Sequence, residues 1–232
     1  MVAPATSFES VRTITGWKRP GRDHGCKPCQ IIPGVWTAHY HDIDSVEKLK
    51  AATATAPITL VVNTAPCQCE AREGFWGPNV KVMAVDLEDD PDERKYFDQG
   101  KQCQSKCAEP DLPLTKRCAG DAMKDFDAVV SAIDACLASG GQALVHCHAS
   151  LSRSVAFLLA YLMKSRGMTL LGAIKHMKLR WDATWPCDRF VLQLIEYETH
   201  LAMPYRFSTV SLAALCAANV AVGVAIGMFL YR

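Results

Sequence analysis

The stretch VHCHASLSRS, residues 145–154, determines the fold that this 232-residue chain is expected to adopt around it. An apolar run typical of a buried strand, residues 143–145, leads into the stretch, and an apolar run of helical character, residues 155–162, leaves it. A loop between a strand end and a helix start directs backbone N–H groups inward and adds the positive end of the helix dipole. The sequence therefore predicts a cradle for a tetrahedral dianion at this loop.

Two side chains of the loop carry the predicted chemistry. Cys147 stands at the mouth of the cradle, where a thiol loses its proton easily and becomes a nucleophile. Arg153 follows after five intervening residues, and its guanidinium can grip two phosphoryl oxygens at once, which a lysine cannot do. The pair predicts cysteine-dependent phosphoryl transfer. Backbone amides of the loop should complete the phosphate site, from His148, Ala149, Ser150, Leu151, Ser152 and Arg153.

The loop resembles the signature loop of the dual-specificity protein phosphatases, members of the tyrosine phosphatase superfamily. The resemblance runs collinearly from about Gln30 to Pro204 through QIIPGVW, APITLVVNTA, NVKVMAVDLED, the helix pair that begins SVAFLLAYLM, and FVLQLIEYE. It implies hydrolysis of phosphotyrosine, phosphoserine and phosphothreonine through a phosphocysteine intermediate, without metal or cofactor. It also implies that Ser154 helps the thiolate to leave and that His146 orients the loop.

The leaving oxygen needs a proton, so a general acid is required. The turn after residue 85 offers four carboxylates: Asp86, Asp89, Asp90 and Asp92. Alignment with the family's strand places the acid at Asp89. In the predicted strand 80–87, the apolar residues Met83, Val85 and Leu87 share one face, and Asp89 follows on the same face, which supports this assignment. Asp86 follows Val82 and Ala84 on the opposite face in the same way, so it remains the alternative general acid.

One residue of the loop departs from the family's pattern. The family usually has glycine three residues after the nucleophile, where this chain has Ser150. If that position requires a glycine-like backbone, serine costs strain of about 1 kcal/mol. Lower activity is therefore one expectation, and a pseudophosphatase that binds phosphorylated partners without turnover is the alternative function. A sulfur-transferase fold is disfavoured by the His-Cys start and the spacing of the loop.

Strands alternating with helices predict an α/β fold with a central, mostly parallel sheet flanked by helices. The expected strands cover residues 35–39, 58–62, 80–87 and 143–147, and the expected helices cover 44–52, 91–97 and 121–140, with three more after the loop. Three parts are expected around this core: an extended N-terminal arm over residues 1–29, the catalytic domain over 30–205 with a Cys-rich insert at about 98–120, and a C-terminal segment over 207–231.

The C-terminal segment predicts a transmembrane helix. Residues 207–231 contain no charged side chain, and Arg206 and Arg232 bracket them. Roughly 20 apolar residues suffice to span a bilayer. The sequence therefore predicts a single-pass tail anchor, with the catalytic domain in the cytosol and the organelle left open. Gly223 and Gly227 have the small-xxx-small spacing that permits weak dimerisation of such a helix.

Charge and cysteine content limit the remaining partners. The net charge of +1 argues against a nucleic-acid partner. A phosphorylated protein is the expected substrate, and a phosphoinositide is the alternative because an anchor would hold the domain beside lipid headgroups. Reduced thiols are expected for the eleven cysteines. A zinc site is the alternative, assembled from Cys26, Cys29, Cys67, Cys69, Cys103, Cys107 and Cys118.

Overall fold

The computed structural model describes residues 6–21, 25–53, 57–70, 72–87, 89 and 121–202. The chain divides into a compact unit over Met1–Thr199 and a second unit over His200–Arg232. The predicted helix at 91–97, the insert at 98–120 and the anchor at 207–231 lie outside the described residues. None of the helices in the described ranges is long and apolar enough to cross a bilayer.

A five-stranded sheet with the order β1-β2-β5-β3-β4 forms the centre of the larger unit. Its strands are β1 (Cys29–Ile32), β2 (Val35–Thr37), β3 (Ile58–Asn63), β4 (Lys81–Ala84) and β5 (Gln142–His146). β1 and β2 form an antiparallel hairpin, and every other pairing in the sheet is parallel. The predicted mostly parallel sheet is confirmed. The strand predicted over 80–87 ends earlier, at Ala84.

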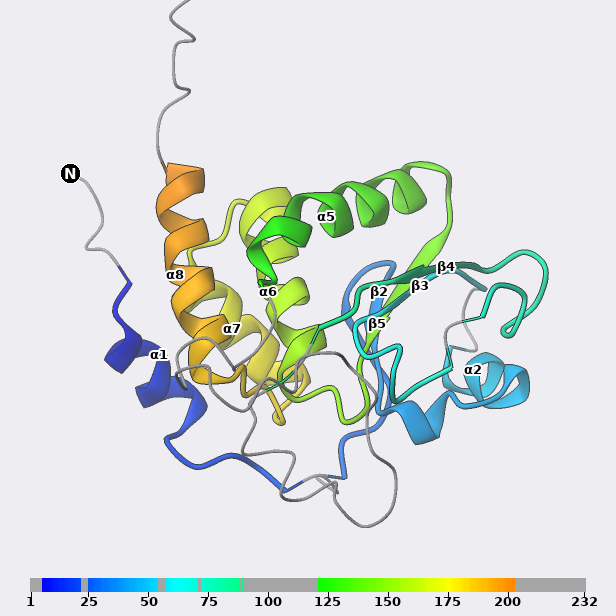
Figure 1. The fold of residues 1–232 in the computed structure, drawn as a ribbon, viewed down its shortest axis with the longest axis horizontal. Helices are drawn as coiled ribbons and strands as arrows, with labels where there is room; N and C mark the ends of the chain where they lie inside the picture. The colour runs from blue at the N-terminus through cyan, green and yellow to red at the C-terminus, as the bar shows by residue number, and fades with distance from the viewer. Residues whose placement is uncertain are drawn as a thin grey trace, which may run out of the picture. The chain divides into compact units, whose positions relative to one another are not determined.

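Helices cover both faces of the sheet, as predicted (Figure 1). Those that contact the sheet are α2 (Val46–Ala52), α5 (Met123–Ala138), α6 (Arg153–Arg166) and α7 (Leu170–Arg180). The last described helix is α8 (Asp188–Ala202). Along β3, Leu60 and Val62 join the core formed with α5 and α6, whereas Val61 joins a smaller core with Leu49 of α2. This alternation arises because successive side chains of a strand point to opposite faces.

The parallel register brings the carboxyl ends of β3 and β5 to one edge of the sheet. Asn63 is paired with His146, the last residue of β5. The N–H and the hydroxyl of Thr64 donate to the His146 carbonyl at 2.9 and 3.1 Å. The signature loop follows at this edge and leads into α6, which packs on β5. Loops at the carboxyl ends of parallel strands form the usual ligand site of open α/β sheets.

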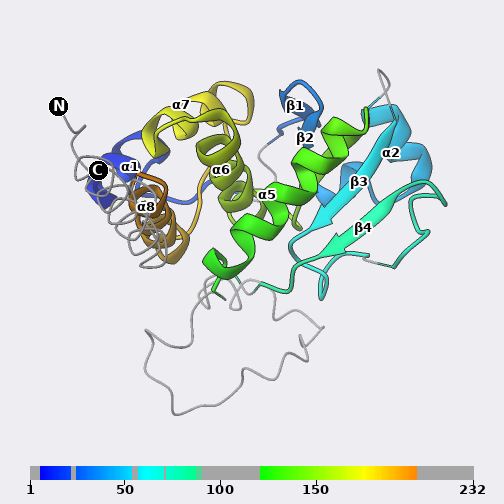
Figure 2. The ribbon, with the colours of Figure 1, turned by 90° about the horizontal axis from the view of Figure 1, so that it is seen from above.

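The expected extended arm is wrong for residues 8–15, which form helix α1 (Phe8–Thr15). Ser7 caps the helix by accepting from the N–H of Ser10. α1 packs on α7, and the two helices lie side by side in Figure 2. Arg12 on this helix is buried and donates to the Asp188 carboxylate and to the Pro186 carbonyl, the latter at 2.9 Å. A helix this short gains most of its stability from such packing.

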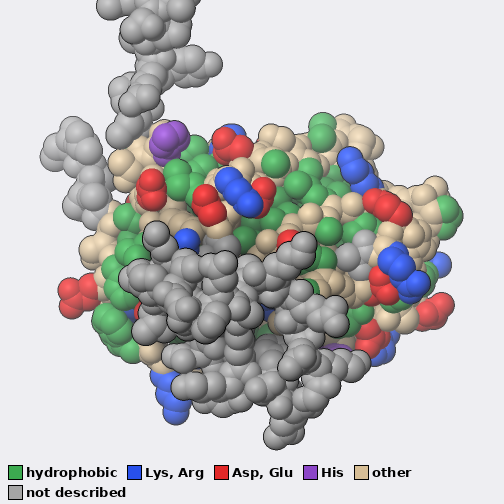
Figure 3. Space-filling model, viewed as in Figure 1, with side chains coloured by type: hydrophobic (Ala, Val, Ile, Leu, Met, Phe, Trp, Pro, Cys, Tyr) green, Lys and Arg blue, Asp and Glu red, His purple; other side chains and the backbone are tan. Residues whose placement is uncertain are grey.

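Surface charges of both signs are interspersed over the described part of the face drawn in Figure 3. This distribution agrees with the net charge of +1.

Replacing Arg12 with Met should lower the free energy of unfolding by about 2 kcal/mol. The reason is that the substitution removes buried hydrogen bonds to Asp188 and Pro186 and the stacking of the guanidinium on Trp185, 4.6 Å from the ring centroid. Urea unfolding measures the change. Arg72→Met removes an exposed ion pair with Glu70 and is the matched control, expected to stay within about 0.5 kcal/mol of the parent. Equal effects of the two substitutions would contradict the assigned role of Arg12.

Candidate active site

Cys147 begins the loop between β5 and α6, and its side chain is 2% exposed. Its sulfur accepts from the N–H of Ser150 at 3.2 Å and from the hydroxyl of Ser154 at 3.5 Å. The N-terminus of α6 follows at Arg153, so the positive end of the helix dipole lies beside the thiol. The structure therefore places two hydrogen-bond donors and a helix N-terminus beside the sulfur of the proposed nucleophile.

The loop residues between Cys147 and the helix are nearly all buried. Relative exposure is 6% or less from Ala149 to Ser154, and His148 alone is partly exposed. Among the residues that the structure describes, Ser150 is the one non-glycine residue with positive φ, at 49°. Ser150 therefore has the backbone strain expected of a serine at this position, because the left-handed region favours glycine.

The segment between α7 and α8 supports the loop at three consecutive residues. The Trp181 indole N–H donates to the Ser150 carbonyl at 2.7 Å. The N–H of Trp185 donates to the Leu151 carbonyl at 2.9 Å, and the N–H of Cys187 donates to the Ser152 hydroxyl at 3.0 Å. Trp181 and Cys187 are buried, so these hydrogen bonds are shielded from water and hold the loop in one conformation.

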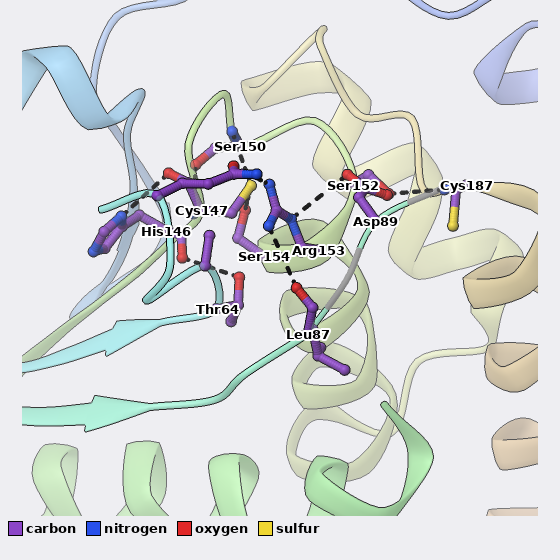
Figure 4. Close-up of polar contacts among 12 residues, drawn as sticks. Thr64, Leu87, Asp89, His146, Cys147, Ser150, Ser152, Arg153, Ser154 and Cys187 are labelled. Atoms are coloured by element: carbon purple, nitrogen blue, oxygen red, sulfur yellow. Dashed lines mark hydrogen bonds and ion pairs between the residues drawn. The ribbon is translucent and has the colours of Figure 1, made fainter. Parts of the chain in front are cut away.

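Arg153 is buried and reaches back over the loop, with its guanidinium between Cys147 and Asp89 (Figure 4). It donates to the Gln68 side-chain oxygen at 2.8 Å and to the Leu87 carbonyl at 3.4 Å, and its Nε lies 3.6 Å from the Asp89 carboxylate. Burial disfavours the charged guanidinium, but the neighbouring Cys147 and Asp89 outweigh it and raise the pKa of Arg153. A permanent cation therefore faces the cradle.

The structure distinguishes the two candidate acids. Asp89 accepts from the Ser152 hydroxyl at 2.8 Å and faces Arg153, so its carboxylate lies at the loop (Figure 4). Asp86 is exposed. Val85 and Leu87 are buried in the core with α5 and α6, so they share one face of the chain, the face on which Asp89 was predicted to follow. Geometry therefore favours Asp89 over Asp86.

His146 lies beneath the loop and is fully buried. Its ring stacks on Tyr40 with centroids 5.8 Å apart and meets Trp76 edge-on at 5.7 Å, while Nδ1 lies 3.2 Å from the Cys147 carbonyl. Burial, aided by the charge of Arg153, lowers the pKa of His146 from 6.5 to about 4. A neutral ring in this place suits an orienting role and does not suit proton transfer at neutral pH.

Replacing His146 with Gln should flatten the pH dependence of stability between pH 4 and 6.5. Below pH 6.5 the unfolded chain binds a proton at His146, whereas the folded chain binds it only near pH 4. The parent should therefore lose about 3 kcal/mol of unfolding free energy through this group as the pH falls across that range. Urea unfolding of both proteins at several pH values measures the difference. Parallel pH profiles would argue against a neutral, buried imidazole.

The pKa values of two other cysteines, Cys69 and Cys29, are raised. Cys69 packs against Cys147, and burial together with this neighbour raises the pKa of Cys69, so its thiol stays protonated. Burial also raises the pKa of Cys29 to about 11, which opposes the thiolate form that zinc requires. Within the described ranges, no three His, Cys, Asp or Glu side chains are placed to hold a metal. Cys103, Cys107 and Cys118 lie outside those ranges.

Sequence reasoning missed several residues that shape the site. Gln68 holds Arg153 and also lines a hollow of about 510 Å³ with Pro66, Cys67, Cys69, Glu70 and Arg72. Tyr40 supports His146, and its N–H donates to the His148 carbonyl at 2.9 Å. A signal was available for Gln68, because residues that follow β3 must lie at the same sheet edge as residues that follow β5.

The chain is similar in sequence to known proteins. The family described as dual specificity phosphatase, catalytic domain matches residues 44–200. Dual specificity protein phosphatase 1 of Arabidopsis thaliana is 40% identical over 82 residues, which are 35% of this chain and 41% of that protein. Dual specificity protein phosphatase 1B of the same plant is 37% identical over 87 residues, 38% of this chain and 52% of that protein. The chain thus spans about half the length of these curated relatives.

A solved structure shares the fold. The human tyrosine phosphatase-like serine/threonine/tyrosine-interacting protein superposes with a TM-score of 0.59 at 23% identity, over 76% of this chain and 99% of that one. The sheet, the helix pair after the loop and the loop itself define the class of cysteine-based phosphatase domains. The chain belongs to the dual specificity phosphatase family, and the matched residues, 44–200, form its catalytic domain.

Proposed function

We propose that this chain hydrolyses phosphotyrosine, phosphoserine and phosphothreonine in proteins through a phosphocysteine intermediate on Cys147. The observation that carries the proposal is the environment of the sulfur, which accepts from the Ser150 N–H and the Ser154 hydroxyl at the start of α6. Arg153, held beside it by Gln68, supplies the cation for a bound phosphoryl group. Nucleophile, acid and anion site all come from the chain's own residues, so the reaction calls for no metal or cofactor.

The proposed reaction has two steps. The Cys147 thiolate attacks phosphorus, the bond from phosphorus to the substrate oxygen breaks, and protonated Asp89 gives its proton to the leaving oxygen. Loop amides from His148 to Arg153 and the Arg153 guanidinium stabilise the charge on the equatorial oxygens. Asp89 then takes a proton from water as that water attacks phosphorus. The sulfur leaves as a thiolate, assisted by the Ser154 hydroxyl, and inorganic phosphate is released.

Asp89→Asn should lower kcat on a phosphotyrosine peptide by about 10² or more, because the leaving phenoxide loses its proton donor. Asp86→Asn is the matched control and should stay within about twofold of the parent, since Asp86 is exposed. Cys147→Ser should abolish turnover on phosphotyrosine and phosphoserine peptides alike. Phosphate release in steady state measures all three variants.

The same assay separates the alternatives. A parent that binds phosphotyrosine peptide but releases no phosphate would support the binding module without turnover. Faster release of phosphate from phosphoinositide vesicles than from phosphopeptides would support the lipid substrate. A larger loss for Asp86→Asn than for Asp89→Asn would overturn the acid assignment.

We further propose that residues 207–231 anchor the chain in a membrane and leave the catalytic domain in the cytosol. Support comes from composition, since this run carries no charged residue. A phosphatase held in this way would act on phosphorylated proteins at the membrane surface. Pairing through Gly223 and Gly227 would then bring two copies together.

Val220→Arg should reduce flotation of the full chain with phosphatidylcholine vesicles, because arginine at the centre of a spanning helix costs about 3 kcal/mol. Leu179→Arg is the matched control, since Leu179 is 84% exposed on the catalytic domain, and its flotation should equal that of the parent. Parent protein that stays in the aqueous fraction would refute the anchor.

A further inference from the structure

The Ser150 side chain is part of the hydrogen-bond network that holds the nucleophile. Its hydroxyl donates to the Ala38 carbonyl at 2.6 Å and accepts from the N–H of Cys147 at 3.3 Å. Ala38 follows β2, so the hydroxyl connects the backbone of the nucleophile to the end of a neighbouring strand. Ser150 and Ala38 are both fully buried, so water does not compete for these bonds.

The backbone of Ser150 is held from the opposite side as well. Its carbonyl accepts from the buried indole of Trp181 at 2.7 Å, and its N–H points at the Cys147 sulfur at 3.2 Å. A glycine in this place could reach the same positive φ without strain, but it has no side chain to hold it there. Serine accepts the strain of φ 49° and gains two buried hydrogen bonds through its hydroxyl.

We propose that Ser150 is a positioning residue for Cys147. Its hydroxyl is hydrogen-bonded both to the N–H of Cys147 and to the Ala38 carbonyl at the end of β2. These two hydrogen bonds keep the Ser150 N–H directed at the sulfur. The residue that departs from the family's glycine is thus an added support of the loop rather than a defect in it. The inference rests on the proposed function, because it concerns the same nucleophile.

The proposal specifies which kinetic step depends on the hydroxyl. Arg153, the cation of the phosphate site, is held by Gln68, Leu87 and Asp89, so binding of inorganic phosphate should depend on the Ser150 hydroxyl less than attack by Cys147 does. Attack by Cys147 should depend on it, since the Ser150 N–H that contacts the sulfur is held in place through this hydroxyl. Loss of the hydroxyl should therefore lower kcat and kcat/KM together, with KM nearly unchanged.

Two substitutions distinguish the effect of the Ser150 hydroxyl from the effect of its strained backbone. Ser150→Ala keeps the strained Cβ, removes the hydroxyl, and fills the space with a methyl group that cannot bond to Cys147 or Ala38. Ser150→Gly removes both hydroxyl and strain, and it leaves a polar space in which one water can bridge the two backbone groups. If the serine were only a tolerated, strained residue, Ser150→Gly would raise activity and stability. If the hydroxyl supports the loop, both variants lose activity, and alanine loses more.

The experiment measures the full chain and three variants on a phosphotyrosine peptide. We expect kcat/KM to fall about tenfold for Ser150→Ala and about threefold for Ser150→Gly, with inhibition by inorganic phosphate within about twofold of the parent. The rate at which iodoacetamide alkylates Cys147 should fall in the same order. Ser139→Ala is the control, because it removes an exposed hydroxyl that donates to the Cys136 carbonyl at 2.8 Å, away from the loop.

Each outcome decides the proposal. Activity of Ser150→Gly at or above the parent, or of Ser150→Ala equal to the parent, would overturn it. Urea unfolding checks that each variant is folded, and glycine, which tolerates positive φ, keeps the test valid if the alanine variant unfolds. A parent that binds phosphate without turnover would refute the proposed function instead, and the order of alkylation rates would still decide the role of Ser150.

Discussion

The reversal of the chain between the end of β5 and the start of α6 is the constraint on which the rest of the site depends. Within residues 147–152 the backbone must leave a strand and enter a helix, and this reversal brings a thiol and a guanidinium to one site. The turn contains a strained residue, Ser150, and its polar groups are buried. A buried polar loop is stable only when its groups find partners, and three neighbouring segments supply them here.

Those partners come from distant parts of the sequence. The segment after β2 bonds the loop through Ala38 and Tyr40, the segment after β3 holds Arg153 through Gln68, and the segment before α8 bonds it through Trp181, Trp185 and Cys187. Arg12 on α1 in turn stacks on Trp185 and bonds Pro186. The N-terminal helix lies outside the family match at 44–200, yet it packs on the segment that supports the loop. Fold stability and loop geometry are therefore coupled in this protein.

Periodicity predicted most of the core elements well. The apolar face of α5 and the fully apolar run of β3 were readable, because burial repeats with the period of the element. Helix α1 was not predicted, although Ser7 and Ser10 form a capping box before it. A helix of eight residues is marginal by itself, and what stabilises it is packing on α7 and the buried Arg12, neither of which a local pattern reveals. Elements whose stability is tertiary are the ones that local patterns miss.

The sequence by itself determined that a thiol, Cys147, and a guanidinium, Arg153, share one loop between a strand and a helix, because their spacing is local. Only the tertiary structure decided that Asp89 rather than Asp86 reaches this loop, that Gln68 and Tyr40 border it, and that the Ser150 hydroxyl has partners at Ala38 and Cys147. The physical reason is the order of the sheet. β5 lies between β2 and β3, so residues about 80 to 110 positions apart in the chain become neighbours at one edge, and no local pattern encodes that adjacency.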